Sequence, residues 1–465
     1  MVRHSGGHAH AITFAADAVD LLAARQQMAL SLGWHIVIAC FGVGFPIFVL
    51  LAEWSSLRHD DPVARRLARR WSQALAVLFA VGAVSGTILS FELGILWPGL
   101  MADFGDVWGL PFTIEGIAFF LEAIFLGLYL YGWDRFSPRA HLLVGLPIPV
   151  AGVASAWFVV TANAWMNQPR GFDIEHYLAT GEVTGIDPWA AMFNPATPVQ
   201  TTHMVLAAIM VSGFGVASVY AVGWLKGRRD RHHRLGFIIP FAIAALVTPF
   251  QIAVGDSAAR FLAERQPVKL AAIEGLYDTQ DCAPLTLGGI FVDDEVRWGL
   301  QVPCGLSLLV DHDPDGVIAG LQEVPPADRP PVNVVRIAFQ VMVAIGFFLL
   351  ALGAWWAWRR WRSHRLPESR WFWWAAVAAG PLAAIALEAG WIVTEVGRQP
   401  WIVYEVMRVE DAVTDAAGLW VGYAVLLVVY TVLTVATIVV LRRLARSPLP
   451  ALEPEAVAPD PLAAP

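Results

Sequence analysis

Long apolar runs, separated by shorter polar connectors, dominate this chain of 465 residues. A spanning helix needs about 20 mainly apolar residues to cross a hydrocarbon core of roughly 30 Å. The pattern predicts such helices at 30–52, 74–97, 112–133, 141–163, 199–225, 236–255, 334–358, 371–394 and 418–442. We therefore predict an all-α integral membrane protein with nine transmembrane helices.

The overall composition agrees with a membrane protein. Hydrophobic residues make up 57% of the chain and charged residues only 15%, whereas soluble domains are about 25% charged. The net charge of −8 says little about partners, because the charges are segregated by side. The expected surrounding is a lipid bilayer, and we expect no nucleic-acid partner.

The positive charges predict the topology. The connectors after the first, third, fifth, seventh and ninth runs hold 20 of the 31 Lys and Arg residues, counting Arg442 at the end of the ninth run. By the positive-inside rule these connectors face the cytoplasm. We expect a multi-pass protein of a bacterial-type cytoplasmic (inner) membrane, with its N-terminus outside and its C-terminus in the cytoplasm.

The connectors also predict the domain organisation. The long connector holds Cys282 and Cys304, and an oxidising compartment permits a disulfide between them; two unpaired thiols are the alternative. The predicted parts are an outside N-terminal segment with a surface helix at 1–29, six spans at 30–255, a long outside loop at 256–333, three spans at 334–442 and a disordered proline-rich cytoplasmic tail at 443–465.

Ionisable side chains inside the predicted spans are candidate functional residues, because a charge at the bilayer centre costs roughly 2.5–3.5 kcal/mol. Glu115 and Glu122 stand seven residues apart, close to two helical turns, and therefore share one helix face. Further polar or sulfur-bearing candidates in or beside the spans are His35, Glu92, His203, Gln340, Met342, Glu388, Glu395 and Arg398.

Two kinds of chemistry fit this group. Histidine and methionine are axial ligands of haem iron. Carboxylates and histidines also pass protons through helix bundles. The spacing does not decide between a haem protein and a proton relay, and Glu115 and Glu122 fit proton delivery in either.

Several motifs, in order along the chain, resemble subunit I of the cytochrome bd quinol oxidases. They are "ARQQMALSLGWH", "IEGIAFFLE", "GWDRF", "TANAWMNQP", "KLAAIE" and "GWIVTEVGRQPW". The resemblance extends from about Arg25 to the ninth span. It implies a haem-bearing oxidase subunit that oxidises quinol at the outer face and reduces O₂ to water with protons from the cytoplasm.

The resemblance also implies roles for individual residues. His203 and Met342 would be the axial ligands of a low-spin haem b. His35 and Glu115 would be axial ligands in the pair formed by a high-spin haem b and the oxygen-binding haem, without a decision on which ligand holds which haem. The catalytic group would be Glu115, Glu122, Glu395 and Trp391, with Trp391 between the haems and Glu122 on the proton path. Arg25 and Arg398 would bind haem propionates.

The long loop at 256–333 aligns with the quinol-binding loop of the family, and Lys269 and Glu274 fall on its quinol-site residues. The loop is short, as in the cyanide-insensitive branch, so the third macrocycle is either haem d or a third haem b. Gln340 stands where well-known members have an arginine, which removes a positive charge near the low-spin haem. The implied partners are a homologous subunit II, quinol and O₂, and small single-span subunits.

Two other functions remain as alternatives. A proton-coupled membrane transporter would use the same carboxylates and histidines without haem. A haem-binding redox paralogue would carry electrons without reducing O₂.

Overall fold

The computed structural model describes residues 7–447, with side chains from Asp20 onward. Residues 1–6 lie outside the described part of the chain, and so do residues 448–465 of the tail that the sequence predicts to be disordered. Within the described residues, nine helical segments are long and apolar enough to span a membrane, which confirms the predicted fold class. The long helices are α1 (Gly7–His59), α2 (Pro62–Leu96), α3 (Pro98–Gly132), α8 (Thr197–Leu225), α9 (Arg231–Arg265), α12 (Val332–Ser363), α13 (Arg370–Val396) and α15 (Leu419–Arg446), with the fourth span built from α4 (Pro138–Gly145) and α5 (Pro147–Asn167).

Prolines explain where several helices begin and break. Pro62, Pro98 and Pro147 stand at the first positions of α2, α3 and α5, where a missing backbone N–H leaves no hydrogen bond unmade. The residue before a proline also disfavours helical dihedrals, and Pro267 follows the end of α9. The helical segment is therefore divided into two helices, the end of α9 and α10 (Pro267–Glu274).

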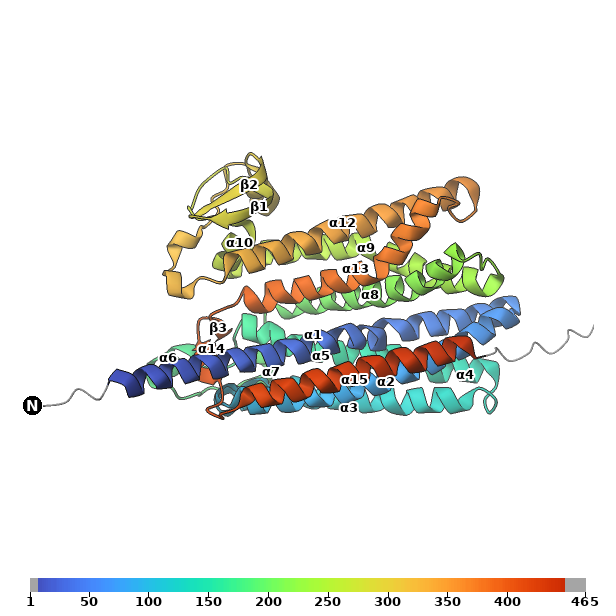
Figure 1. Ribbon diagram of the computed structural model, residues 1–465, viewed down its shortest axis with the longest axis horizontal. Coiled ribbons are helices and arrows are strands. Elements are labelled where there is room, and N and C mark those ends of the chain that lie inside the picture. Colours follow the sequence, from blue (N-terminus) through green and yellow to red (C-terminus); the bar gives the residue numbers. More distant parts are fainter. Residues whose placement is uncertain (1–6, 448–465) are drawn as a thin grey trace, which may run out of the picture.

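The boundary at residues 29 and 30 is not a structural break. The segment that the sequence presents as a surface helix continues without interruption into the first span, and α1 is one helix of 53 residues. Figure 1 shows α1 running from the N-terminal side along the whole length of the bundle. The helix therefore extends beyond the bilayer at its N-terminal end.

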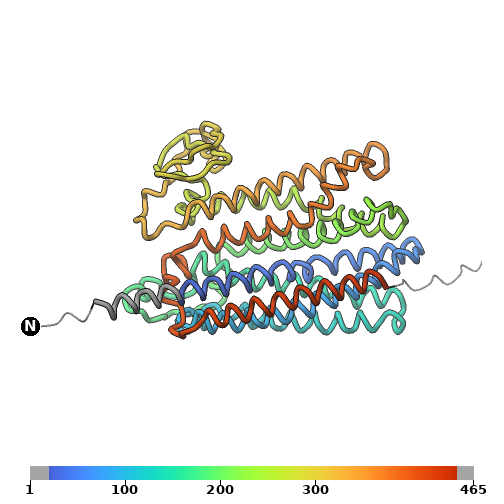
Figure 2. The backbone as a smooth tube through the Cα atoms, viewed as in Figure 1, coloured from blue at the N-terminus to red at the C-terminus, as the bar shows by residue number. Residues whose placement is uncertain are grey.

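The spanning helices form two groups of four. In the first group α1 packs against α2 and α5, and α3 packs against the same two helices. In the second group α8 packs against α9 and α13, and α12 packs against the same two. In each group the remaining pair, α1 with α3 and α8 with α12, is diagonal. Contacts of α8 with α1 and α5 join the groups, and α15 covers α1 and α2 (Figures 1 and 2).

The two ends of the bundle differ (Figure 1). The arginine-rich turns between α1 and α2, α8 and α9, and α12 and α13 lie at one end. The other end carries the short elements, namely α6 (Ile174–Thr180), α7 (Pro188–Met192), α10, α11 (Gly305–Asp311), α14 (Val409–Ala412), the strands β1 (Leu285–Val292), β2 (Glu295–Val302), β3 (Trp401–Val403) and β4 (Met407–Arg408), and 3₁₀ turns at Leu321–Glu323 and Pro326–Asp328.

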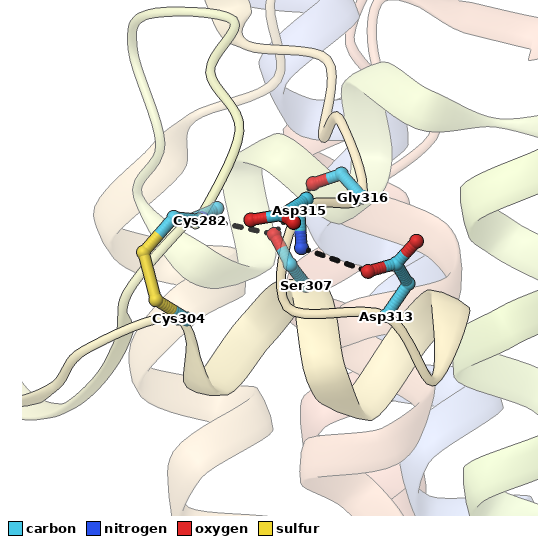
Figure 3. The surroundings of a disulfide bond; sticks show 7 residues. Cys282, Cys304, Ser307, Asp313, Asp315 and Gly316 are labelled. Atoms are coloured by element: carbon cyan, nitrogen blue, oxygen red, sulfur yellow. Dashed lines mark hydrogen bonds between the residues drawn. A yellow bond between two sulfur atoms is a disulfide. The ribbon is translucent and has the colours of Figure 1, made fainter.

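The strands are an addition to the all-α prediction. β1 and β2 form an antiparallel hairpin that pairs Leu285 with Val302 and Val292 with Glu295. Asp293 and Asp294 form its two-residue turn, and both have positive φ, as the turns favoured in such hairpins require. A disulfide joins Cys282, just before β1, to Cys304, just after β2 (Figure 3). The long outer loop is therefore a small folded unit.

Candidate functional site

The first polar centre lies in the bundle of α1, α2, α3 and α5. His35 of α1 and Glu115 of α3 are on diagonal helices, and each contacts a serine of a neighbouring helix in the bundle. His35 Nδ1 lies 2.8 Å from Ser85 Oγ of α2, and Ser155 of α5 donates to Glu115 Oε1 at 2.7 Å. A Cβ at Gly86 would come within 3.1 Å of the His35 ring. The glycine thus leaves space beside this imidazole.

Glu122 lies two turns along α3 from Glu115, as its spacing predicts. Its side chain is 5% exposed, and its Oε1 atom has no hydrogen-bond partner among the described residues. Gly42 of α1 and Gly152 of α5 make the room for it, since a Cβ at Gly152 would stand 3.4 Å from Oε1. A buried carboxyl oxygen without a protein partner calls for a proton or a water molecule.

The second centre lies in the bundle of α8, α9, α12 and α13. His203 of α8 and Met342 of α12 are again on diagonal helices. His203 Nε2 lies 3.1 Å from Gln251 Nε2 of α9, while His203 Nδ1 is buried without a partner among the described residues. Glycines also stand beside these side chains: a Cβ at Gly255 would reach within 3.3 Å of the His203 ring, and one at Gly390 within 3.1 Å of Met342 Sδ.

Helix α13 carries Trp391 and Glu395 on one face and ends near Arg398. Trp391 packs against the core that α8, α9, α12 and α13 share. Glu395 accepts hydrogen bonds from Asn163 of α5 and from Arg398, whose Nη2 lies 2.7 Å away. Arg398 is 3% exposed, and its Nε and Nη1 atoms lack partners among the described residues. A buried guanidinium with free donors is suited to a further anion.

Lys269 and Glu274 both lie in α10 and are buried, at 2% and 8% exposure. They do not pair with each other. Lys269 Nζ donates to Asn167 Oδ1 at 2.7 Å, and the backbone carbonyl of Glu274 accepts from Arg336 at 2.5 Å. Burial, helped by the charge of Arg398, lowers the pKa of Lys269 to about 7. Burial raises the pKa of Glu274 to about 7, against the pull of Arg336.

Arg25, by contrast, is exposed, and its Nη2 donates to Gln399 Oε1 at 3.1 Å. This contact places the Arg25 side chain beside the segment that follows Arg398. The structure therefore distributes the predicted residues over three places: His35, Glu115 and Glu122 on helices of the first bundle, His203 and Met342 on helices of the second, and Lys269, Glu395 and Arg398 at the outer end.

Sequence reasoning missed the residues that hold these groups in place. Ser85, Ser155 and Gln251 bind the candidate histidines and Glu115, while Asn163 and Asn167 bind Glu395 and Lys269. The two asparagines fall inside the "TANAWMNQP" motif, so the motif marked their location without revealing their contacts. Arg336, fully buried at the start of α12, gave no signal in the sequence.

The geometry defines a class of protein: an integral membrane protein with two polar centres inside adjoining four-helix bundles and buried ionisable groups above them. The model of the cytochrome bd terminal oxidase subunit I family matches residues 23–448. The chain belongs to this family.

Individual relatives agree along nearly the whole length. The solved bd oxidase of Geobacillus thermodenitrificans aligns with a TM-score of 0.86 and 40% sequence identity, over 92% of this chain and 98% of that one. A Bacillus subtilis (strain 168) protein provisionally named cytochrome bd menaquinol oxidase subunit I is 36% identical over 91% of this chain and 96% of its own length. The cytochrome bd ubiquinol oxidase subunit 1 of the same strain is 30% identical over 85% and 86%.

Membership in this family implies haem cofactors, and the two centres fit them. The second centre offers His203 and Met342, and the first offers His35 and Glu115, as the side chains that would hold haem iron. The glycines at 86, 255 and 390 are places that a Cβ would fill. His203 Nδ1 and the Nε and Nη1 atoms of Arg398 are buried and have no hydrogen-bond partner among the described residues. A macrocycle with acidic propionates meets these demands.

Proposed function

We propose that this chain is the haem-bearing subunit of a terminal oxidase that oxidises quinol at the outer face of a bacterial cytoplasmic membrane and reduces O₂ to water inside the bundle. The observation that carries the proposal is the placement of His203 and Met342, and of His35 and Glu115, on diagonal helices of two four-helix bundles. The enzyme works with a homologous subunit II. The arginine-rich end is the cytoplasmic end, which puts α10 and the hairpin outside.

The proposed roles of the ligands follow the geometry. His203 and Met342 would hold a low-spin haem b. His35 and Glu115 would hold the high-spin haem b and the third haem, which is haem d or another haem b. Bound haem supplies the one-electron chemistry and the site of O₂ reduction. Arg398, with two buried donors to spare, and Arg25 would bind propionates.

Quinol oxidation needs groups that accept hydroxyl protons at neutral pH. Glu274 and Lys269 meet this need, because burial brings the pKa of each to about 7. Lys269 donates hydrogen bonds to Asn167 and to the backbone carbonyl of Thr394. Thr394 belongs to the same helix as Trp391 and Glu395. The α10 site thus connects directly to α13, a helix of the second bundle that also contacts α1 of the first.

The inner carboxylates serve O₂ reduction. Glu122, with an oxygen that has no partner among the described residues, would carry protons from the cytoplasmic side toward Glu115. Glu395 would lie beside the ring pair, where it forms an ion pair with Arg398. Protons leave the quinol outside and enter from the cytoplasm, so turnover separates charge without pumping. A transporter would leave Met342 and the buried Lys269 without a role.

The test is made on the complex purified with its second subunit. We expect haem bands in the reduced-minus-oxidised spectrum and O₂ consumption with a quinol. Met342→Leu should remove the low-spin band and lower O₂ consumption about a hundredfold or more, since even partners of metal ligands are worth 10–100-fold. Met210→Leu, at another buried methionine, is the matched control and should keep both signals. A complex without haem bands would refute the proposal.

A further inference from the structure

A buried cluster of titratable groups lies in the first bundle, apart from the centres described above. Its members are Glu53 of α1, Tyr129 of α3 and His141 of α4, none more than 3% exposed. Tyr129 Oη donates to Glu53 Oε2 at 2.5 Å, and His141 Nδ1 lies 2.6 Å from Glu53 Oε1. The mechanism above gives these three side chains no task.

The hydrogen bonds assign the protons in this cluster. His141 Nε2 lies 2.9 Å from the backbone oxygen of Tyr129. A carbonyl oxygen only accepts, so Nε2 carries a hydrogen. The contact of 2.6 Å between Nδ1 and Glu53 Oε1 then requires one shared proton, because two lone pairs at that distance would repel. The pair of Glu53 and His141 therefore holds one transferable proton and has no net charge.

A small cavity gives water access to this pair. It has a volume of about 10 Å³ and is lined by Glu53, His141, Ser56, Leu57, Arg65, Trp133 and Pro138. One water molecule occupies a cavity of about this size. Arg65 is exposed, so the cavity wall reaches the arginine-rich end of the bundle. Besides Glu53 and His141, Arg65 is the one ionisable residue among the described residues that line this cavity.

The cluster is in line with the inner carboxylates. Tyr129 follows Glu122 by seven residues, as Glu122 follows Glu115, so all three lie on one face of α3. Seven residues span roughly 10 Å along a helix, so a proton that passes from the pair to Glu122 crosses about this distance beside α3. Glu122 Oε1, buried and without a partner among the described residues, is the receiving atom that this line requires.

We propose that the Glu53–His141 pair is the proton-collecting site of this chain, which takes protons from the arginine-rich side and passes them to Glu122. The shared proton leaves toward Glu122, the pair is left with one negative charge, and a proton from the bulk solution, relayed through the cavity, restores it. No electron moves in this step. Tyr129 is a positioning residue that fixes the Glu53 carboxylate. The proposal rests on the proposed function, which makes this end the cytoplasmic side.

The test uses the two-subunit complex reconstituted in lipid vesicles. Glu53→Gln removes the transferable proton and keeps the side-chain volume. We expect quinol-driven O₂ consumption to fall about tenfold at pH 8.5, where protons are scarce, and about twofold at pH 6, since a positioned acid–base group contributes 10²–10⁴-fold at most. Haem spectra should stay unchanged. Glu368→Gln, an exposed carboxylate in the connector between α12 and α13, should keep the wild-type pH profile.

A structural role of the cluster would give a different result. An equal loss at both pH values, or no loss, would overturn the proposal. If Glu53→Gln does not assemble, Tyr129→Phe removes a single hydrogen bond, and a wild-type pH profile in that variant would overturn it as well. A wild-type complex that consumes no O₂ with quinol would instead refute the proposed function, so the two failures are distinguishable.

Discussion

Lys269 and Glu274 show how burial tunes single residues. Both are charged residue types, yet both are almost fully buried in one short helix outside the spans. Desolvation moves their pKa values from opposite directions to about 7. A group transfers protons best when its pKa is near the operating pH. The two residues are therefore matched to quinol oxidation in neutral surroundings.

Glu274 should set the pH dependence of quinol oxidation. Because its pKa is raised to about 7, the carboxyl is protonated below pH 7 and accepts no further proton. We expect kcat/KM for quinol to rise about tenfold from pH 6 to pH 8 in the wild-type complex. Glu274→Gln should lower kcat/KM about a hundredfold at pH 8 and abolish the rise.

The control for this prediction is Glu264→Gln. Glu264 is exposed at the end of α9, two residues before Gln266, the N-cap residue of α10. It should keep the wild-type activity and pH profile. A pH dependence that persists in Glu274→Gln would assign the titration near pH 7 to another group.

The sequence revealed those residues of the candidate site that are costly to bury in a membrane. It did not reveal the residues that are not. Glu115 and Glu122 stand out in an apolar run, because a charge there is expensive. Ser85 and Ser155, which bond to His35 and Glu115, do not, because a serine inside a helix satisfies its hydroxyl on the backbone of the preceding turn. Contacts between distant elements, such as Asn163 with Glu395, depend on packing that no local pattern encodes.

One face of α12 holds the outer hairpin. Asn333, Arg336 and Gln340 follow one another at helical spacing, and all three bind β1. Arg336 donates to the carbonyls of Thr286 and Gly288, and it also binds those of Ile273 and Glu274 in α10. Gln340 bonds to Gly288 N and Thr286 O. A bare strand edge is thereby covered, and the hairpin is tied to the proposed quinol site.

Arg336→Leu should release the hairpin. The change removes four hydrogen bonds to backbone carbonyls, of which only that of Thr286 keeps a side-chain donor, Gln340, and hydrogen bonds to a charged group contribute about 1.5–3 kcal/mol each. We expect faster protease cleavage within the hairpin and a KM for quinol raised about tenfold, because the end of α10 loses its support. Limited proteolysis and quinol titration measure the two effects.

Arg297→Gln is the matched control. Arg297 lies in β2, half exposed, and pairs only with Asp293 of the same hairpin among the contacts described. Exposed ion pairs contribute about 0–1 kcal/mol, so neither proteolysis nor KM should change. An Arg336→Leu complex that resists protease like the wild type would show that the disulfide and β pairing hold the hairpin without α12.

At the level of elements, hydropathy located the spans but not the outer loop. Nine spans follow from long apolar runs, since only helices satisfy their backbone within a bilayer. The breaks before Pro147 and Pro267 also have local causes. The hairpin around "LTLGGIFVDDEVRWGLQV" was missed, because its edge is completed by α12 side chains more than 40 residues away in the sequence.

At the scale of the whole molecule, the two bundles repeat one design. Each places a histidine on one helix and its counterpart on the diagonal helix, and each sets these side chains against glycines of neighbouring helices. The proposed proton line runs along α3 at one side, while α10 and α13 approach the other centre from the outer end. In the proposed function, protons and electrons enter from opposite ends, which makes the orientation in the membrane decisive for charge separation.

Cysteine labelling in whole cells tests that orientation. The chain has three cysteines: Cys282 and Cys304 are joined in the disulfide, and Cys40 is buried, so the wild type should give almost no background. Glu182 follows α6 at the outer end, and Glu368 lies between α12 and α13 at the arginine-rich end; both are exposed. A membrane-impermeant maleimide should label Glu182→Cys in intact cells and Glu368→Cys only after the membrane is opened, because the positive-inside rule predicts that the arginine-rich connectors face the cytoplasm. The opposite pattern would invert the topology and place quinol oxidation and proton uptake on the wrong sides.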